Sequence, residues 1–413
     1  MTPLSAYSGY GIELEYMIVD QDTLSVRPVA DTLLRNASGE VVNELTRNSM
    51  GWSNELTLHL IEIKNKHPVP ELLPLVNAFQ LEVAGINRRL KALGACLMPT
   101  GMHPWMDPVS ETRLWPHEYA DIYQAYDRIF GCRRHGFANL QSMHLNLPFQ
   151  NDAQFARLHA AVRLILPILP ALAASSPIAE GGPSGFLDNR LEAYRTHQAK
   201  LPSTMGQVIP DTISSRAEYQ ALILQPMYEA ISSFDPQGTL RHEWLNARGA
   251  IPRFERMAVE IRLIDMQEYP GADLAVAAAI TAVVRWLDEG KRSDLAAQQS
   301  YPTHRLAELL HSCIRDADLV RIEDPAYLAL LGLSPAPCSA AELWRQLIGS
   351  WWQREPQQRK TWGEPLNVIL EHGPLSRRIL RAAGPDCTRP RLKQIYRALC
   401  NCLSTGRPFL GLD

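Results

Sequence analysis

Three short segments of the chain each carry two side chains that can bind ions or polar ligands. In each segment the two lie two residues apart between apolar neighbours. The pairs are Glu13 with Glu15, His144 with Asn146, and Glu260 with Arg262. Alternate residues of a β-strand point to the same face, so each segment has one apolar face and one face that can bind ions. A single strand of this kind is typical of a solvated sheet face, but such faces are rich in Lys, Thr and Ser. Together the three segments predict a sheet whose polar face forms an acidic hollow.

Two further glutamates, Glu55 and Glu62, extend this hollow only if the chain between them bends. The segment 55–64 alternates apolar and polar residues and predicts a strand. Residues seven positions apart on an ideal strand point to opposite faces, so both glutamates face the hollow only with a β-bulge or a bend. The alternative, that Glu55 is a surface residue, stays open.

Several carboxylates in one hollow repel one another, by roughly 4 kcal/mol for a pair about 4 Å apart at an effective dielectric of about 20. A hard divalent cation relieves this repulsion, and oxygen ligands with one histidine favour Mg²⁺ or Mn²⁺ over zinc. Metal ions beside an arginine are the equipment of phosphoryl transfer. The sequence contains neither a P-loop motif nor a GxGxxG motif that opens a helix, which excludes these two kinds of nucleotide site.

The elements that must position these residues change in kind along the chain. Strands are predicted in the first two thirds, at 11–20, 55–64, 141–147, 239–245 and 257–267. The clearest helix covers 71–93, where apolar residues recur every three or four positions. Further helices are predicted at 117–130, 155–172, 272–289, 304–315, 339–353, 374–383 and 391–403.

Strands joined by long connections and followed by helices favour an α+β fold, with a mainly antiparallel sheet and a helical C-terminal region. We expect a catalytic domain at 1–300 and a helical region at 301–413 packed on it. Asp265 and Glu268, at the end of the last predicted strand, are expected on the surface. Arg253, Glu255 and Arg256, which precede that strand, are expected in a solvated turn, and the alternative that they reach a bound phosphate stays open.

The composition is that of a globular protein, with 46% hydrophobic and 21% charged residues in a chain of 413. A net charge of −3 argues against a nucleic-acid-binding protein, which normally has a basic excess. The first residues lack the pattern of a signal peptide, and the longest apolar run, 164–178, is too short to span a bilayer. The seven cysteines lack the spacing of a zinc site or a disulfide framework. We therefore expect a cytoplasmic protein with neither nucleic-acid nor membrane partners.

Five motifs, in chain order, resemble those of the glutamate–cysteine ligase superfamily, and most closely its bacterial family 2, the carboxylate–amine ligases. They are GIELEY, ELTLHLIEIK, SMHLNL, the Ser175-Ser176-Pro177 turn followed by Arg190, and VEIRLID, and they span about residues 11–270. The resemblance implies a glutamine-synthetase-like domain, in which an antiparallel sheet forms a funnel or half-barrel flanked by helices. It also implies ATP and two or three Mg²⁺ ions as cofactors.

The resemblance further implies a reaction and a set of site residues. The γ-phosphate of ATP would pass to a carboxylate, typically that of glutamate, and an amine, typically that of cysteine, would then displace the phosphate, as in glutathione biosynthesis. Asn146 would contact the nucleotide or a substrate, Arg262 the transferred phosphoryl group, and Arg190 the acidic substrate, with Glu260 and Arg262 as the catalytic pair. The implied metal ligands are Glu13, Glu15, Glu55, Glu62, His144 and Glu260.

The chain departs from the family pattern where Asn65 follows Lys64 in place of a frequent threonine, and in the segment after Ser175. These differences leave the acceptor amine open. Two other functions also stay open: a metal-dependent amidohydrolase, for which we would expect more histidine ligands, and a non-catalytic binding protein with the same fold. The expected partners are small-molecule substrates, and assembly into a homo-oligomer stays open.

Overall fold

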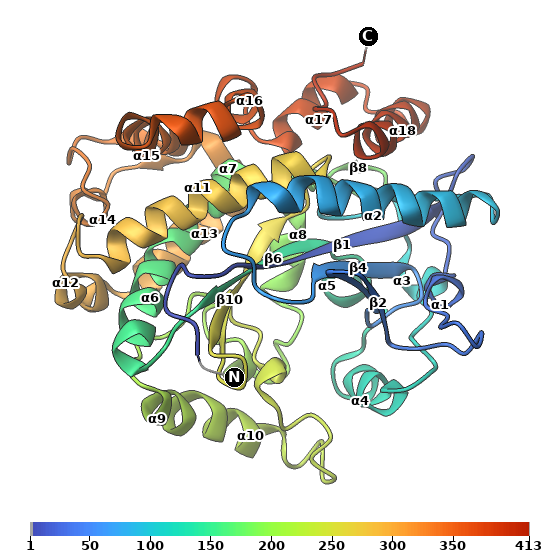
Figure 1. Cartoon of the computed structure of the whole chain (residues 1–413), viewed down its shortest axis with the longest axis horizontal. Helices are drawn as coiled ribbons and strands as arrows, with labels where there is room; N and C mark the ends of the chain where they lie inside the picture. The colour runs from blue at the N-terminus through green and yellow to red at the C-terminus, as the bar shows by residue number, and fades with distance from the viewer. Residues whose placement is uncertain (1–2, 413) are drawn as a thin grey trace.

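The computed structural model describes residues 3–412 and is built around one antiparallel sheet of eight strands (Figure 1). The strand order is β2-β3-β4-β1-β6-β10-β9, and β5 also pairs with β1. Among the described residues the two end strands do not pair, so the sheet is open and the predicted α+β fold is confirmed. The strands are β1 Gly11–Asp20, β2 Glu44–Arg47, β3 Met50–Asn54, β4 Leu60–Asn65, β5 Ala95–Met98, β6 Ser142–Pro148, β9 Ala250–Arg253 and β10 Ala258–Asp265. Two small two-stranded sheets lie outside this sheet: β7 Ile178–Ala179 with β8 Gly182–Pro183, and β11 Arg321–Ile322 with β12 Cys338–Ser339.

Long helices cover one face of the sheet. α2 (Leu73–Lys91) and α6 (Asp152–Ile165) contact its strands, and α11 (Pro270–Asp288) packs against both helices. In Figure 1, α2 and α11 cross above the sheet, and the C-terminal helices lie above them. These are α15 Ala340–Arg354, α16 Pro356–His372, α17 Leu375–Ala383 and α18 Arg389–Thr405.

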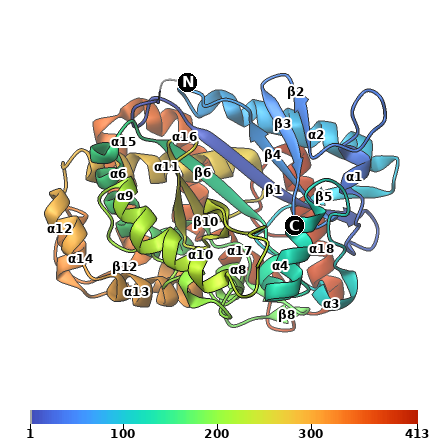
Figure 2. The same cartoon turned by 90° about the horizontal axis from the view of Figure 1, so that it is seen from below.

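Shorter helices complete the fold, and some of them flank the other face of the sheet. Seen from below in Figure 2, α4, α8 and α10 surround the strands β1, β6 and β10. The shorter helices are α1 Ala30–Leu33, α3 Pro108–Glu111, α4 Ala120–Phe130, α5 His135–Ala138, α7 Leu169–Ala173, α8 Asn189–Tyr194, α9 Arg216–Tyr219, α10 Gln225–Ile231, α12 Leu295–Ser300, α13 Thr303–Asp316 and α14 Pro325–Leu330.

The alternation read in the sequence explains which face of the sheet is covered. Ile12 and Leu14 of β1 are fully buried in the same hydrophobic cluster as Phe79 and Val83 of α2. Burying one such side chain stabilises the fold by about 1.5–3 kcal/mol, so a one-residue slip of any strand would reverse a large gain. Apolar burial on one face therefore fixes which side chains point to the other.

The strand predictions are confirmed at β1, β6 and β10 and need correction elsewhere. The predicted strand at 55–64 begins only at Leu60, and Glu55 lies in the loop after β3. The strand predicted at 239–245 is wrong: that segment holds a 3₁₀ turn, Glu243–Leu245, and the next strand is β9. The short strands β2 and β3 were not predicted, because ELTR shows no apolar alternation and the alternation of Met50 with Trp52 in MGWSN covers only three residues.

Each predicted helix is confirmed within a few residues, and one long helix was missed. The missed helix is α16, which is polar and contains Pro365 in its interior. The segment predicted at 155–172 forms α6 and α7, separated by a 3₁₀ turn at Leu166–Ile168 where its prolines lie. The domain boundary near residue 300 stays a prediction.

Two helical segments, 152–173 and 270–288, are long and apolar enough to cross a membrane by length and composition. In each, 94% of the apolar window is buried inside the protein. Packing in the core therefore accounts for their apolar character.

The acidic residues at the end of β10 are buried, so the prediction that they lie on the surface is wrong. Glu268 pairs with Arg378 of α17, with Oε1 and Nη1 2.5 Å apart. Arg378 also donates to the Phe409 carbonyl at 2.7 Å, and the Phe409 N–H donates to Glu268 at 3.2 Å. The end of β10 is thus tied to the C-terminal segment of the chain. Asp265 is also fully buried, and its partners belong to the site described below.

His103 is a buried histidine held neutral by its neighbours. Its Nε2 lies 2.8 Å from the Leu24 carbonyl, and its Nδ1 accepts from the Trp105 N–H at 3.2 Å, so it has no free position for a second proton. Burial lowers the pKa of His103 to about 3. In the unfolded chain histidine has a pKa of about 6.5, so below this pH the unfolded state binds a proton that the folded state does not bind. The free energy of unfolding therefore falls as the pH falls below about 6.5.

We predict that His103→Gln reduces the slope of unfolding free energy against pH by about 1.4 kcal/mol per pH unit between about pH 5.5 and 4. Urea denaturation at several pH values measures this slope. The exposed His304→Gln should leave the slope unchanged. Equal slopes for His103→Gln and the unmodified protein would contradict the assignment.

Candidate active site

Strand register places the predicted polar side chains on one face of the sheet, opposite the covering helices. Glu13 of β1 lies across from Lys64 of β4 and from His144 of β6, and Glu15 lies across from Glu62. Residues directly opposite one another in antiparallel strands point to the same face. The pairs that are separate in the sequence therefore form one continuous polar surface.

Glu55 reaches this surface from the loop between β3 and β4. One carboxylate oxygen from each of Glu15, Glu55 and Glu62 lies within 4.8 Å of the other two. The loop bend, rather than a bulge within one strand, brings Glu55 and Glu62 to the same side. Glu55 is half-buried and faces the hollow, which answers the question that the sequence left open.

A second group of potential ligands adjoins the first. Atoms of Glu13, Glu62 and His144 also lie within 4.8 Å of one another, so Glu62 belongs to both groups. Oxygen donors with a single imidazole are the set that a hard divalent cation prefers. The residues present therefore fit two neighbouring cation positions joined by Glu62.

Burial and like charge raise the pKa of two of these carboxyl groups. For Glu55 the main cause is burial, followed by the charges of Glu15 and Glu62, and its pKa lies well above the ordinary value. The pKa of Glu62 is also raised, by burial and by Glu13. Both shifts mean that the folded protein holds negative charge at a cost, which a bound cation would remove.

Glu13 and His144, which also lie in the hollow, stabilise each other's charged forms. His144 Nδ1 lies 3.0 Å from Glu13 Oε2. Burial opposes ionisation of both groups, but their hydrogen bond and mutual attraction prevail, so the pKa of Glu13 is lowered and that of His144 is raised.

Lys64 is a site residue that the sequence analysis did not select. Its Nζ lies 2.9 Å from Glu62 Oε1 and 3.2 Å from Glu44, and it partly neutralises the carboxylates. It lies two positions from Glu62 on the same strand. The rule that paired Glu13 with Glu15 would therefore have found it.

Glu260 lies in the hollow, between two arginines. Its Oε2 accepts from Arg253 Nη1 at 2.9 Å, and its Oε1 lies 3.2 Å from Arg262 Nε. Glu260 is in neither carboxylate group, so its role as a metal ligand stays a prediction. The prediction of a solvated turn is wrong for Arg253. Arg256 is largely exposed, yet its Nη1 comes within 3.8 Å of Glu13 Oε1.

Asn146 extends the polar surface at its edge. Its Nδ2 donates to Glu13 Oε1 at 3.3 Å, and its register partner is Glu260. Its Oδ1 is buried and has no hydrogen-bond partner among the described residues. The amide thus keeps an acceptor for a bound molecule, and its proposed contact with nucleotide or substrate stays a prediction.

Arg190 is held in place by a buried network rather than by the sheet. Its Nε donates to Asp265, which also accepts from the Ser175 N–H at 2.9 Å and the Ser176 hydroxyl at 2.7 Å. A Cβ at Gly101 would collide with the Asp265 carboxylate, so only glycine fits there. The serine turn and the end of β10, two separate motifs in the sequence, therefore act together to orient one guanidinium group.

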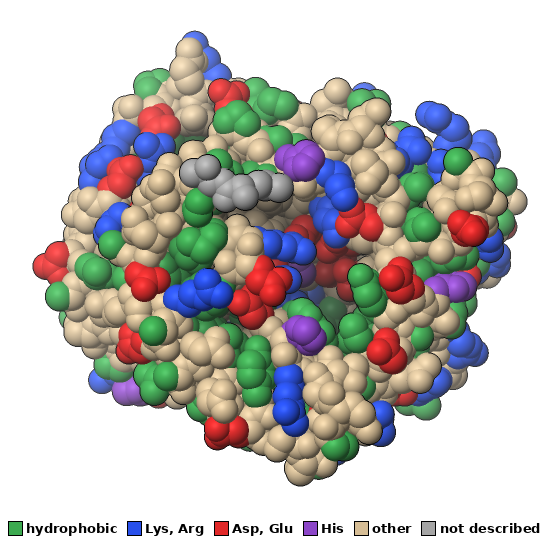
Figure 3. All heavy atoms as spheres, turned by 60° about the horizontal axis from the view of Figure 1, so that its bottom comes forward, with side chains coloured by type: hydrophobic (Ala, Val, Ile, Leu, Met, Phe, Trp, Pro, Cys, Tyr) green, Lys and Arg blue, Asp and Glu red, His purple; other side chains and the backbone are tan. Residues whose placement is uncertain are grey.

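A cavity of about 280 Å³ opens beside the polar surface. Figure 3 shows this face as a hollow in which acidic, basic and histidine side chains gather, with hydrophobic side chains at its rim. Aromatic residues form much of its wall. The lining includes Glu15, Glu55, His144, Arg190, Arg262, Tyr123, Tyr126, Phe137, Tyr194, Gln198 and Trp244.

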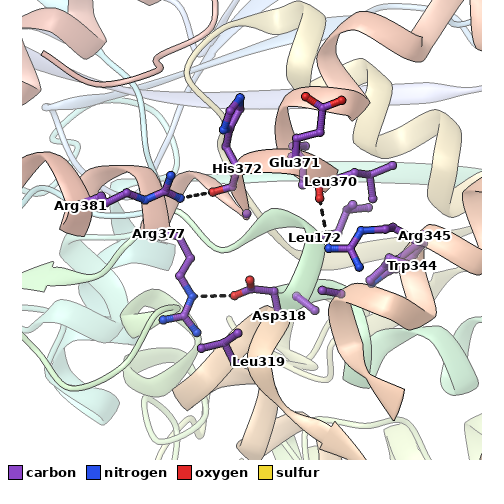
Figure 4. Close-up of a pocket in the computed structure, with 14 residues that line it drawn as sticks. Leu172, Asp318, Leu319, Trp344, Arg345, Leu370, Glu371, His372, Arg377 and Arg381 are labelled. Atoms are coloured by element: carbon purple, nitrogen blue, oxygen red, sulfur yellow. Dashed lines mark hydrogen bonds and ion pairs between the residues drawn. The ribbon is translucent and has the colours of Figure 1, made fainter. Parts of the chain in front are cut away.

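A second cavity, of about 250 Å³, lies among α7, α15, α16 and α17 (Figure 4). Each of its three arginines is bonded to a protein group. Arg377 pairs with Asp318 at 2.7 Å, and the other two bind backbone carbonyls at the end of α16, Arg381 that of His372 and Arg345 that of Leu370. These contacts explain the basic residues there as helix-end and ion-pair partners.

We predict that Asp265→Asn destabilises the protein by about 3–5 kcal/mol, because it leaves the buried Arg190 without its counter-charge. Chemical denaturation measures the loss. The exposed Asp121→Asn is the matched control, and the double variant Asp265→Asn with Arg190→Met should recover much of the stability. A loss below about 1 kcal/mol would show that the pair is not the anchor described here.

We predict that Glu55→Gln stabilises the metal-free protein by roughly 1 kcal/mol at neutral pH, because it removes one of several crowded charges. The same change should reduce the stabilisation that added Mg²⁺ gives, since a ligand that binds only the folded state raises its stability. Thermal unfolding with and without Mg²⁺ tests both effects. The exposed Glu308→Gln should change neither, and a destabilised Glu55→Gln protein would contradict the account of repulsion.

The chain is similar to known proteins over nearly its whole length. The family model described as glutamate-cysteine ligase family 2 matches residues 10–397. An uncharacterized protein of Archaeoglobus fulgidus is 31% identical over 401 residues, which cover 97% of this chain and 100% of the relative. A protein of Cupriavidus metallidurans named "Putative glutamate--cysteine ligase 2" is 29% identical over 191 residues, 45% of this chain and 46% of the relative.

Two solved structures share the fold. The glutamate–cysteine ligase of Francisella tularensis in complex with AMP has a TM-score of 0.57 at 13% identity, over 96% of this chain and 91% of that one. A bifunctional glutathione synthetase of Pasteurella multocida has a TM-score of 0.54 at 12% identity, over 95% of this chain and 53% of that one. Since the family model spans the sheet, the acidic hollow and most of the C-terminal helices, the chain belongs to glutamate–cysteine ligase family 2.

Proposed function

We propose that this protein is an ATP- and Mg²⁺-dependent ligase that joins the γ-carboxylate of glutamate to an amine through an acyl phosphate. The observation that carries the proposal is the presence of two clusters of potential metal ligands that share Glu62. Arg262 lies beside them in the same hollow. Family membership supports the ligase class, and the AMP bound to the Francisella enzyme supports a nucleotide site in this fold.

The residues of the hollow divide the work between cation and anion binding. Glu13, Glu62 and His144 would hold one Mg²⁺, and Glu15, Glu55 and Glu62 a second. When bound, Mg²⁺ would neutralise phosphate oxygens and so lower the barrier to phosphoryl transfer.

Arg262 is the residue that we assign to the transferred phosphoryl group. Its guanidinium lines the cavity, and its buried Nε makes no hydrogen bond to the described residues, although it lies within ion-pair distance of Glu260. A planar guanidinium can donate two parallel hydrogen bonds to phosphate or carboxylate. Arg253 on the far side of Glu260 keeps that carboxylate paired, so Arg262 is free to turn toward a substrate.

Arg190 is the residue that we assign to the acidic substrate. Its Nη2 is buried and unbonded among the described residues, and its other contacts fix its direction. The charge is already balanced by Asp265, so Arg190 would contribute a directed hydrogen bond more than a net positive field. An ion pair with no net charge orients a bound substrate through its hydrogen bonds more than it attracts the substrate from solution.

The two other readings of the acidic hollow account for less of the site. An amidohydrolase would be expected to use several histidines, and His144 is the single histidine in the two ligand groups among residues 3–412. An amidohydrolase would also give no role to Arg262, whose Nε makes no hydrogen bond to the described residues. A non-catalytic protein would not require the buried like charges that raise the pKa of Glu55. Small-molecule substrates, a cytoplasmic location and a role in glutathione biosynthesis stay part of the proposal.

We predict that the purified protein, given ATP, Mg²⁺, glutamate and a panel of amines, releases ADP and forms a γ-glutamyl amide in equal amounts. Arg262→Gln should lower kcat by about 100-fold or more, the usual cost of losing one donor to developing charge. Coupled ADP detection and mass spectrometry of the amide measure both products.

The control for this assay is Arg321→Gln, an exposed arginine outside the hollow, which should retain full activity. Amide formed without ADP would favour the amidohydrolase acting in reverse. Neither product across the whole panel would favour the non-catalytic alternative, and an undiminished Arg262→Gln enzyme would remove Arg262 from the mechanism.

A further inference from the structure

The cavity beside the carboxylates holds several buried polar atoms that no described residue satisfies. They include Tyr194 Oη, Gln198 Oε1 and Arg190 Nη2. The exposed fractions of these three residues are 7%, 3% and 1%. Buried donors and acceptors are nearly always paired, so unpaired ones that converge on one cavity indicate a bound molecule. The arginine donates, the amide oxygen accepts and the hydroxyl can do either. The molecules that fill the cavity must therefore offer both acceptors and a donor.

Much of the lining of the same cavity is aromatic. Tyr126 of α4 lies with its ring centre 6.1 Å from that of Phe137 in α5 and 5.8 Å from that of Trp244. All three side chains are half-buried and line the cavity, so part of each ring is accessible from it. One face of Trp244 is covered by the stacked His242 ring, which leaves its other face and its edge for a ligand. Concave aromatic surface of this kind is typical of sites for ligands with a flat apolar face.

The acidic end of the cavity determines where an amine would lie. Glu15 and Glu55 line the cavity together with Tyr123, whose hydroxyl accepts from Asn54 at 2.9 Å. Since these carboxylates would hold Mg²⁺ in the proposed reaction, the neutral amine would lie at this end beside the Tyr123 ring and next to the phosphoryl group that the metal binds. The arginines lie among the lining residues as well and suit the acid. The cavity thus combines features for an amine, an acid and an apolar group.

We infer that the acceptor amine of this enzyme carries an aromatic or similarly large apolar group, which packs on Tyr126, Phe137 and Trp244. The inference rests on the proposed ligase function and names its second substrate. The side chain of cysteine is small and would leave most of this aromatic surface uncovered. A ring-bearing amine would cover it while its nitrogen lies toward the acidic end.

The reaction itself is unchanged by this choice. The amine nitrogen forms a bond to the acyl carbon, the bond from that carbon to the phosphate oxygen breaks, and inorganic phosphate leaves with the electron pair. The amine attacks in its neutral form, and after the new bond forms its positively charged nitrogen loses one proton to water. The apolar group takes no part in these steps and acts by binding and orientation.

Two amines that differ only by a phenyl ring test the inference directly. With ATP, Mg²⁺ and glutamate, 2-phenylethylamine should give kcat/KM about tenfold or more above ethylamine, and should also exceed cysteine, because the ring adds aromatic contact. Trp244→Ala should reduce this ratio several-fold, and Trp244→Phe should largely keep it. Trp352→Ala, a half-buried tryptophan that does not line the cavity, is the matched control.

Calorimetric titration of the same two amines, with no ATP present, supplies a readout that does not depend on turnover. The ring should tighten binding to the unmodified protein and to Trp352→Ala, but not to Trp244→Ala. Phe137→Ala, on a different element, provides a second variant in case Trp244→Ala fails to fold.

Three outcomes would overturn the inference. Cysteine or ethylamine could match or exceed 2-phenylethylamine, the preference for the ring could survive both wall variants, or 3-phenylpropionate could replace glutamate and prove the preferred ring-bearing substrate. If no amine yields ADP while binding still depends on the ring, the proposed ligase function fails and recognition of the apolar group by the cavity stands.

Discussion

Buried carboxylates packed side by side are the constraint on which the rest of this structure depends. Glu15, Glu55 and Glu62 lie within 4.8 Å of one another, an arrangement that is unfavourable without compensation. The apolar face of the same sheet supplies that compensation through burial against α2 and α6. Lys64 and the arginines supply the rest by charge. Apolar burial on one face of the sheet thus offsets the carboxylate repulsion on the other face.

Orientation in the hollow comes from a set of contacts behind it. Asp265 is fully buried and binds Arg190 together with two serines of the turn that follows α7. Because each of these groups is paired, the guanidinium is rigid before any substrate arrives. Rigid placement lowers the entropy lost on binding, which is why a fixed donor is more effective than a mobile one.

Much of the site could be predicted from the sequence because its main feature is local. A period of two identifies Glu13 with Glu15 and Glu260 with Arg262 without knowledge of the fold. The aromatic wall could not be predicted, since Tyr126, Phe137 and Trp244 come from three separate elements with no shared pattern. Glu268 was misplaced for a similar reason: its partner Arg378 is 110 residues away. The short strands β2 and β3, which pair with each other across a tight turn, were missed because four or five residues of mixed type carry only a weak strand signal.

The contact of Glu268 with Arg378 and Phe409 also bears on how the protein is made. Translation adds residues in order, and Phe409 follows Glu268 by 141 positions. Until α17 and the C-terminal segment have been made, the Glu268 carboxylate has neither the Arg378 guanidinium nor the Phe409 N–H as a partner. The attachment of this segment to the rest of the fold is therefore completed only once α17 and the residues that follow α18 have been synthesised.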